Sequence, residues 1–175
     1  MDTGPMLAKY ATEIGADESA PELTARLAGL GASALSETLP LIERGEIAPL
    51  PQNNDAASYA PMLKREDGLI DWQMTARDLH HRVRAFQPWP GVYTTFRGAR
   101  LSFWRAREVA PQSDHADVAP GTITGSDKAG IIIACAPQTA LRVEELQIEG
   151  KRRMSAPDFA NGTRLHTGDR ITDAQ

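Results

Sequence analysis

The repeat of apolar positions changes along the chain near residue 90. In two stretches, residues 20–45 and 75–86, apolar side chains recur every three or four residues, whereas from residue 92 they alternate with polar ones. The first repeat is typical of helices that bury one face, and alternation is typical of half-buried strands. The chain is therefore predicted to have an α+β fold, helical in its first part and β-rich in its second.

The first helical stretch carries its own start and stop signals. Residues 19–22 read Ser-Ala-Pro-Glu, which is a capping box with proline in the first turn. Gly29 and Gly31 weaken the pattern that follows, so we expect one helix to end there and a second to continue to Gly45. Pro40 is expected to kink this second helix or to end it.

Ahead of these helices, residues 6–14 are moderately apolar with partial alternation, which predicts a strand. A lone strand has no sheet to join, and even a two-stranded hairpin is marginal in water. We therefore expect residues 1–50 to be the end of a larger α/β domain that begins before Met1.

A polar segment separates this part of the chain from the next. Residues 49–58 are polar and contain proline, which is the composition of a linker, and we assign residues 51–74 to it. Residues 75–78 read Thr-Ala-Arg-Asp, which resembles a second capping box at the start of a helix. We accordingly assign residues 75–175 to a second domain.

The second helix runs into a stiff corner, residues 84–91, which reads Arg-Ala-Phe-Gln-Pro-Trp-Pro-Gly. Pro88 disfavours helical angles at Gln87, so the helix is predicted to stop there. Trp89 lies between two prolines, each with its φ angle fixed near about −65°. We expect the indole to fill a core, and the alternative is that the corner sets the angle between two domains.

Five short segments beyond the corner alternate apolar and polar side chains. They are separated by a turn at residues 97–100, by a polar loop at residues 111–120 and by glycine-containing turns, and Ser155 is expected to cap a last short helix. Short strands with turns of this kind predict a small barrel or sandwich. The predicted strands are residues 92–96, 101–109, 122–125, 131–134 and 141–146.

The composition is that of a globular protein. Of the 175 residues, 41% are hydrophobic and 24% are charged, which is ordinary for a folded domain. No apolar run approaches the roughly 18 residues of a membrane span, and we see no export signal near the N-terminus. Together with a single cysteine, this leads us to expect a cytoplasmic protein without membrane contact. We also expect a monomer, although neither composition nor charge bears on the oligomeric state.

Metal or thiol chemistry is not expected. His80 and His81 are adjacent on a predicted helix, so their side chains point about 100° apart and cannot share one ligand face. No cysteine or third histidine lies nearby in the sequence, which argues against a zinc site. Cys135 ends an apolar strand, where a thiol is usually an inert core group.

Charge is divided unevenly along the chain. Residues 1–80 hold 6 Lys or Arg and 13 Asp or Glu, a net −7, whereas residues 81–175 hold 13 and 10, a net +3. A local positive field attracts phosphates, and small barrels are frequent hosts of RNA, although such a cluster also occurs on solvated faces. The candidate RNA-contacting residues are Arg82, Arg84, Arg97, Arg100, Arg105, Arg107, Lys151, Arg152 and Arg153.

Several segments, in chain order, resemble the methionyl-tRNA formyltransferase family. The most specific is the corner at residues 84–91, although Gln87 stands where the family more usually has Asn. The resemblance spans nearly the whole chain. The other segments are residues 2–6, 59–61, 71–72, 104–106, 120–123 and 150–155.

The resemblance implies a remnant of a Rossmann-like formyltransferase domain, then a linker, then a C-terminal barrel resembling an OB fold. The family moves a formyl group from 10-formyltetrahydrofolate to the amino group of methionyl initiator tRNA. Asp2 matches the Asp of the family's Asp-Thr-Gly, which tunes a catalytic His beside the reacting carbon. The family's Asn and His would lie before Met1, so we expect this polypeptide alone to be inactive.

Two other functions remain open at this point. The chain could be a stand-alone barrel that holds tRNA without chemistry. It could also be a relative that formylates a sugar nucleotide or hydrolyses formyl-folate, since those enzymes share the architecture. The corner favours the tRNA enzyme by likeness, with tRNA rather than DNA as the partner.

Overall fold

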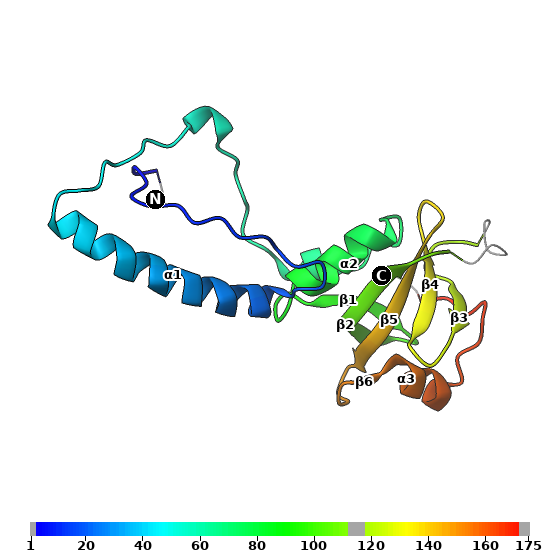
Figure 1. The fold of residues 1–175 in the computed structure, drawn as a ribbon. Coiled ribbons are helices and arrows are strands. Elements are labelled where there is room, and N and C mark those ends of the chain that lie inside the picture. The colour runs from blue at the N-terminus through cyan, green and yellow to red at the C-terminus, as the bar shows by residue number, and fades with distance from the viewer. Residues whose placement is uncertain (1–2, 112–117, 172–175) are drawn as a thin grey trace. The chain divides into compact units, whose positions relative to one another are not determined.

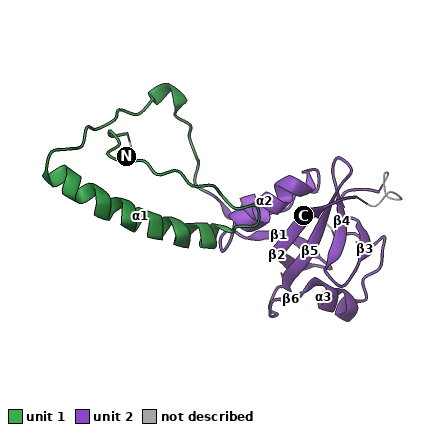
Figure 2. Cartoon of the chain, viewed as in Figure 1, with its two compact units in different colours: residues 1–62 green, residues 63–175 purple. Residues whose placement is uncertain are grey.

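The computed structural model describes residues 3–111 and 118–171. The chain divides into two units, Met1–Met62 and Leu63–Gln175, which are drawn in green and purple in Figure 2. Each unit is described by itself. No helix in the described part of the chain is long and apolar enough to cross a membrane.

Unit 1 is built around one long helix, α1 (Ala20–Glu43), seen in Figure 1. The predicted start is confirmed, because the Glu22 carboxylate accepts hydrogen bonds from the Ser19 backbone N–H (2.8 Å) and the Ser19 hydroxyl (2.6 Å). The prediction of two helices is wrong, since α1 runs through both glycines and ends only after Pro40. Each glycine costs about 1 kcal/mol relative to alanine, which is too little to interrupt a helix of this length.

The predicted strand at residues 6–14 is also wrong. Only Met6 pairs with another segment, through an isolated bridge to Leu50 with two backbone hydrogen bonds of 2.8 Å. No described side chain of unit 1 belongs to the buried hydrophobic core, and residues such as Leu35 (58% exposed) and Ile14 (59%) lie in solvent. Partial alternation predicted a strand here, but a strand forms only where neighbouring strands supply hydrogen-bond partners.

Unit 2 is organised by a six-stranded antiparallel sheet in the order β1-β2-β5-β4-β3, with β6 paired to β5 (Figure 1). All five predicted strands are confirmed with small shifts at their ends. The strands are β1 (Val92–Phe96), β2 (Ala99–Val109), β3 (Ile123–Ser126), β4 (Ile131–Cys135), β5 (Thr139–Ile148) and β6 (Met154–Ser155).

The helices of unit 2 start where the sequence predicts. Thr75 caps α2 (Ala76–Ala85), and Ser155 caps α3 (Ala156–Thr163), each by accepting a hydrogen bond from a backbone N–H three residues on. Two short 3-10 turns, η1 (Asn54–Ala56) in unit 1 and η2 (Arg65–Gly68) in unit 2, complete the elements. Such caps satisfy N–H groups that a helix start leaves without partners.

The hydrophobic core of unit 2 begins before its first helix. Ile70 (2% exposed) and Trp72 (3%) are buried in it, and the rings of Trp72 and Phe103 lie 6.2 Å apart. The backbone N–H of Ile70 donates to the carbonyl of Tyr93 at 2.9 Å. The boundary between the units therefore falls inside the stretch 51–74, and residues 63–74 pack with the sheet that follows them.

The corner after α2 confirms the predicted helix end but not the predicted role of its tryptophan. The helix stops at Ala85, and the Gln87–Pro88 and Trp89–Pro90 peptides are both cis. Trp89 is 56% exposed, so the expectation that it fills a core is wrong. Pro90 is the buried residue of this turn, while Trp72 supplies the tryptophan of the core.

Gly68 provides a test of how tightly η2 packs against the corner. A Cβ at Gly68 would lie 2.0 Å from the carbonyl oxygen of Gly91. Because such a contact forces the backbone to move, Gly68→Ala is expected to lower the free energy of unfolding by about 1–3 kcal/mol. Urea unfolding followed by tryptophan fluorescence measures it.

Gly162→Ala is the matched control, since Gly162 lies in α3 with nothing within 4 Å of its added Cβ. It is expected to keep or to raise stability, by up to about 1 kcal/mol. Equal stabilities for the two variants would contradict the close approach at Gly68.

Candidate nucleic-acid interface

The ladder between β2 and β5 is irregular in one short stretch, where two adjacent side chains of each strand face outward. Phe103 pairs with Leu146 and Ala106 with Val143, and between these pairs the register shifts twice. Both flanking pairs are buried, whereas the two residues enclosed on each strand are not. Bulges on both strands therefore place two consecutive side chains of each strand on the outer face of the sheet. These are Trp104 and Arg105 on β2, and Glu144 and Glu145 on β5.

The outward side chains form ion pairs across the ladder. Glu144 accepts from two arginines of β2, from Arg105 Nε at 2.7 Å and from Arg107 Nε at 3.2 Å. Glu145 pairs with Arg153, which precedes β6. The Arg105 and Arg107 side chains are 59% and 49% exposed, so each pair contributes at most about 1 kcal/mol to stability. Their main effect is to hold the guanidinium groups in place.

Trp104 contacts one of these cations, Arg153. Its indole Nε1 donates to Gln147 Oε1 at 3.0 Å, and the Arg153 guanidinium lies 5.0 Å from the indole centroid. The Gln147 amide in turn donates to the carbonyl of Lys151 at 2.8 Å. We call Trp104, Arg105, Arg107, Glu144, Glu145, Gln147 and Arg153 the outer patch.

Gln87 fastens the end of α2 to the bulge beneath the outer patch. Its side-chain amide donates to the carbonyl of Trp104 at 2.7 Å and to the carbonyl of Val83 at 3.0 Å. The first bond satisfies a backbone oxygen at the irregular ladder position, and the second satisfies one at the helix end. The side chain at position 87 thus links the helix to the strand that carries Arg105 and Arg107.

The structure brings together three of the nine predicted cations, Arg105, Arg107 and Arg153, within the outer patch. Lys151 and Arg152 directly precede Arg153 and are exposed. No ion pair between either of these two and a carboxylate is found among residues 3–111 and 118–171.

The other four predicted cations lie outside the outer patch, on α2, in the turn between β1 and β2, and at the start of β2. Arg82 and Arg84 occupy the last turn of α2, and Arg82 lies 5.7 Å from the Phe86 ring centroid. Arg97 is in the turn between β1 and β2 and donates to the Thr163 carbonyl at 3.1 Å. Arg100 lies 3.7 Å over the Tyr93 ring. Asp2, the predicted catalytic residue, lies outside the described residues.

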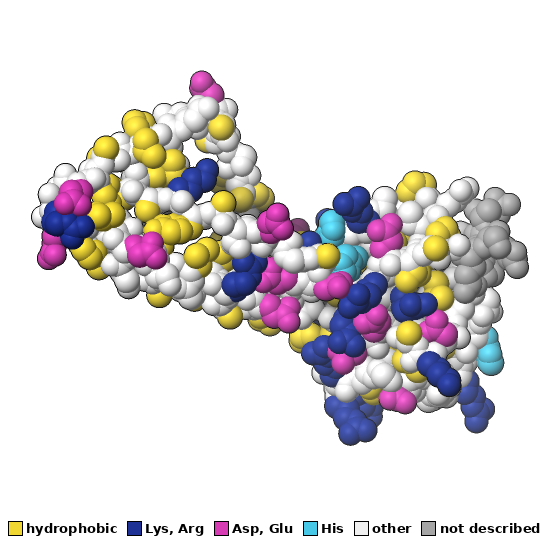
Figure 3. Space-filling model, in the orientation of Figure 1, with side chains coloured by type: hydrophobic (Ala, Val, Ile, Leu, Met, Phe, Trp, Pro, Cys, Tyr) yellow, Lys and Arg dark blue, Asp and Glu magenta, His cyan; other side chains and the backbone are white. Residues whose placement is uncertain are grey.

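The face of unit 2 seen in Figure 3 carries Lys and Arg side chains close together, with Asp and Glu among them. The sequence indicated the cations but not the carboxylates that hold them, Glu144 and Glu145, nor Gln147, which bonds Trp104. A signal for them exists in the sequence. Period-two alternation slips by one residue in both strands, at Phe103-Trp104-Arg105-Ala106 and at Val143-Glu144-Glu145-Leu146.

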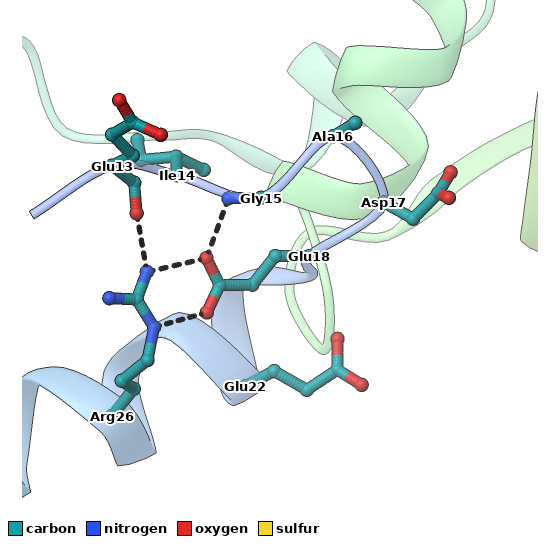
Figure 4. Close-up of a pocket in the computed structure, with 8 residues that line it drawn as sticks. All are labelled: Glu13, Ile14, Gly15, Ala16, Asp17, Glu18, Glu22 and Arg26. Atoms are coloured by element: carbon teal, nitrogen blue, oxygen red, sulfur yellow. Dashed lines mark hydrogen bonds and ion pairs between the residues drawn. The ribbon is translucent and has the colours of Figure 1, made fainter.

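Unit 1 has a hollow of about 710 Å³ beside the start of α1, shown in Figure 4. Its single cation, Arg26, is held by Glu18 through bonds of 2.8 Å from Nε and from Nη2. Nη2 also donates to the Glu13 carbonyl at 2.6 Å, and Nη1 donates to Thr12. Because each guanidinium nitrogen is engaged, Arg26 braces the preceding loop against the helix rather than offering a ligand site.

Histidine and cysteine side chains do not form a metal site in the described part of the chain, where no three of His, Cys, Asp and Glu gather to hold an ion. His80 Nδ1 lies 2.7 Å from the Ala106 carbonyl, which links α2 to β2. Partial desolvation of the His81 ring, which stays largely exposed, and the nearby Arg84 charge lower the pKa of His81. Both histidines are thus accounted for by the packing and charges around α2.

Comparison with known proteins identifies the family. Residues 62–164 match the family described as formyl transferase, C-terminal domain, which covers unit 2 from its start to the end of α3. The chain belongs to the formyl transferase C-terminal domain family.

Named relatives of this formyl transferase domain cover nearly all of the chain. It is 45% identical over 171 residues to the methionyl-tRNA formyltransferase of Solibacter usitatus, covering 98% of this chain and 53% of that protein. It is 38% identical over 169 residues to the enzyme of that name from Bacillus subtilis, covering 97% and 52%. The chain thus spans about half the length of the curated relatives it matches.

Solved structures share the fold of this formyl transferase domain at low sequence identity. An N-formyltransferase from Helicobacter canadensis, in complex with folinic acid and dTDP-3-aminofucose, matches with a TM-score of 0.61 and 13% identity, over 82% of this chain and 51% of that one. HypX from Aquifex aeolicus matches with a TM-score of 0.64 and 17% identity, over 99% and 33%. These likenesses support the arrangement of the elements and leave function to other evidence.

The single thiol of the formyl transferase domain should be unreactive. Cys135 is 2% exposed, and burial raises the pKa of its thiol to about 12. At pH 8 only about one thiol in ten thousand would be ionised, and the thiolate is the reactive form. We expect no reaction with Ellman's reagent in the folded protein. We expect prompt reaction in about 6 M guanidinium chloride, which unfolds the protein and exposes the thiol. Rapid reaction of the folded protein would show that β4 opens readily.

Proposed function

We propose that this chain is the tRNA-holding C-terminal part of a methionyl-tRNA formyltransferase. Such an enzyme transfers a formyl group from 10-formyltetrahydrofolate to the amino group of methionyl initiator tRNA. The observation that carries the proposal is 45% identity to a protein of that name across 98% of the chain. A folate donor is supported by solved neighbours in complex with folinic acid and tetrahydrofolic acid.

Each part of the chain has a proposed role. Residues 1–50 are a remnant of a Rossmann-like catalytic domain. Residues 51–74 lead out of it, and their last part packs into the core of unit 2. Residues 75–175 form a helix and an OB-like barrel that hold tRNA. The exposed apolar side chains of α1 support the first assignment, because a helix with an apolar stripe is stabilised by packing against a further layer. The antiparallel sheet with its own core supports the last.

The cations of unit 2 are proposed to contact the tRNA backbone. Lys151 and Arg152 are exposed and have no carboxylate partner among the described residues, so a phosphate can approach them without displacing an ion pair. Arg105, Arg107 and Arg153 already have carboxylate partners, which a phosphate would replace. The first two should therefore contribute more to affinity than the paired arginines do.

The proposed catalytic part is Asp2, which would orient a histidine that takes the proton of the attacking amine. The proposed working state is a monomer in the cytoplasm.

A second candidate is a module that binds tRNA without chemistry. It is favoured by one observation, that unit 2 has a continuous hydrophobic core of its own, from Ile70 to Ile171. Such a domain can hold RNA whether or not a catalytic domain is attached.

Binding to tRNA should depend steeply on salt. The affinity falls as salt rises, and each phosphate contact that is lost makes the slope of log K against log salt less steep by about 0.9. We expect Lys151→Ala and Arg152→Ala each to reduce the steepness of this slope by about that amount and Arg105→Ala to reduce it less. Fluorescence anisotropy with an initiator tRNA transcript at several salt concentrations gives the slopes. Lys9→Ala, an exposed lysine in unit 1, is the control, and a salt-independent affinity would contradict the proposal.

The polypeptide of 175 residues should not transfer formyl groups by itself. The expected result is no formylmethionyl-tRNA above the level without protein, because the group that removes the amine proton is lacking. The assay uses charged initiator tRNA and 10-formyltetrahydrofolate, with a full-length relative as the positive control. Turnover close to that of the relative would show that the reactive centre lies within the chain.

A further inference from the structure

Trp89 is distinctive among the large apolar side chains of unit 2. In the described part of this unit, only Leu63 (40% exposed) and Trp89 (56%) are exposed large hydrophobic residues. The other two tryptophans have clear roles, since Trp72 fills the core and Trp104 is hydrogen-bonded in the outer patch. Neither role applies to Trp89.

The backbone that carries Trp89 is held in place on both sides. Prolines at 88 and 90 restrict φ before and after it, Pro90 is buried, and the Gly91 N–H donates to the Phe86 carbonyl at 2.9 Å. A tryptophan side chain has only two rotatable angles, so a ligand that contacts it has little conformational freedom to remove. The corner therefore presents a flat aromatic surface to solvent at low entropic cost.

Next to Trp89 lies a hollow of about 100 Å³ with a cation in its wall. Pro88 and Pro90, the two neighbours of Trp89, line it together with Arg100 and Ser102. The Arg100 guanidinium stacks 3.7 Å from the Tyr93 ring centroid and makes a long hydrogen bond of 3.5 Å from Nη2 to the Pro90 carbonyl. The stack fixes the guanidinium plane, and the long bond is weak enough to be exchanged for an anionic oxygen.

The charge around the corner favours a nucleic acid over an apolar protein partner. Residues 79–107, which include the corner, contain six arginines and no carboxylate. A protein contact of the apolar kind needs a contiguous apolar patch, and Trp89 has only Leu63 as another exposed large apolar residue within the described part of its unit. An exposed aromatic ring with Arg100 in the adjoining hollow is instead a combination suited to unpaired nucleotides.

We propose that Trp89 is a stacking platform for one unpaired nucleotide of RNA, with Arg100 in the adjoining hollow as a donor to a phosphate or ribose oxygen of that nucleotide. The inference rests on the proposed tRNA-holding function and adds a site to it. Trp89 would contact the face of a base, whereas the exposed cations would make the salt-dependent contacts with phosphates.

The first test is tRNA affinity of the full chain at fixed salt. We expect Trp89→Ala to weaken binding of an initiator tRNA transcript about 10-fold and Trp89→Phe to weaken it less than about 3-fold, because phenylalanine keeps a face for stacking. The slope of log K against log salt should stay unchanged in both, since no phosphate contact is lost. Leu63→Ala is the matched control and should bind like the unaltered chain.

The second test avoids any loss of folding in the variants. The emission of Trp89 is the difference between the tryptophan fluorescence of the unaltered chain and that of Trp89→Phe. An eight-nucleotide oligoadenylate should quench this component in the unaltered chain. A blunt, fully paired RNA duplex should not. Unchanged tRNA binding by Trp89→Ala, or absence of this quenching, would overturn the stacking site. Self-association of the chain that Trp89→Ala abolishes, with tRNA binding unaltered, would also overturn it in favour of a protein contact.

The two tests separate this inference from the function on which it rests. If the unaltered chain fails to bind tRNA but the oligoadenylate quenches Trp89, the tRNA-holding function fails and the stacking site stands. If the chain binds tRNA with a steep salt dependence and Trp89 is indifferent, the function stands and the stacking site fails. If neither is observed, both are wrong.

Discussion

The pairing of β2 with β5 is the interaction on which unit 2 depends. These are the two longest strands, they lie in the middle of the sheet, and their inner face supplies Phe103, Val143 and Leu146 to the core. On the outer face, the paired bulges turn out two adjacent side chains of each strand, where regular alternation would turn one of every two adjacent side chains inward. One irregularity in the hydrogen bonding thus leaves the core intact and assembles a charged surface directly above it.

The two units differ in what holds them together. Unit 2 has a continuous core that reaches from Ile70 before its first helix to Ile171 near its end. Unit 1 has a well-capped helix and a braced loop but none of the buried hydrophobic side chains, so its described residues are held mainly by local hydrogen bonds and the Arg26 ion pair. Isolated helices are marginal in water even with good caps, because packing supplies most of their stability. Independent stability is therefore a property of unit 2.

The sequence predicted the elements of unit 2 well because local signals and packing agree there. The caps at Thr75 and Ser155 and the alternation of β1 to β5 each have a short-range cause. The strand at residues 6–14 failed because alternation says nothing about whether a partner strand exists. Trp89 was placed in a core on the strength of its size, but the turn buries Pro90 instead. The candidate cations were found from charge alone. A slip in the alternation of each strand indicates the bulges, but the pairing of Arg105 with Glu145 across 40 residues, which brings the partners together, has no local signal.

The ion pairs of the outer patch have a consequence for how a polyanion would be recognised. Because Glu144 and Glu145 lie among Arg105, Arg107 and Arg153, the opposed charges largely cancel a short distance from the surface. Such a surface exerts little long-range attraction on an anion and does little to raise its association rate. Discrimination would instead arise at close range, where only a molecule whose phosphates coincide with the held guanidinium groups can exchange places with the carboxylates.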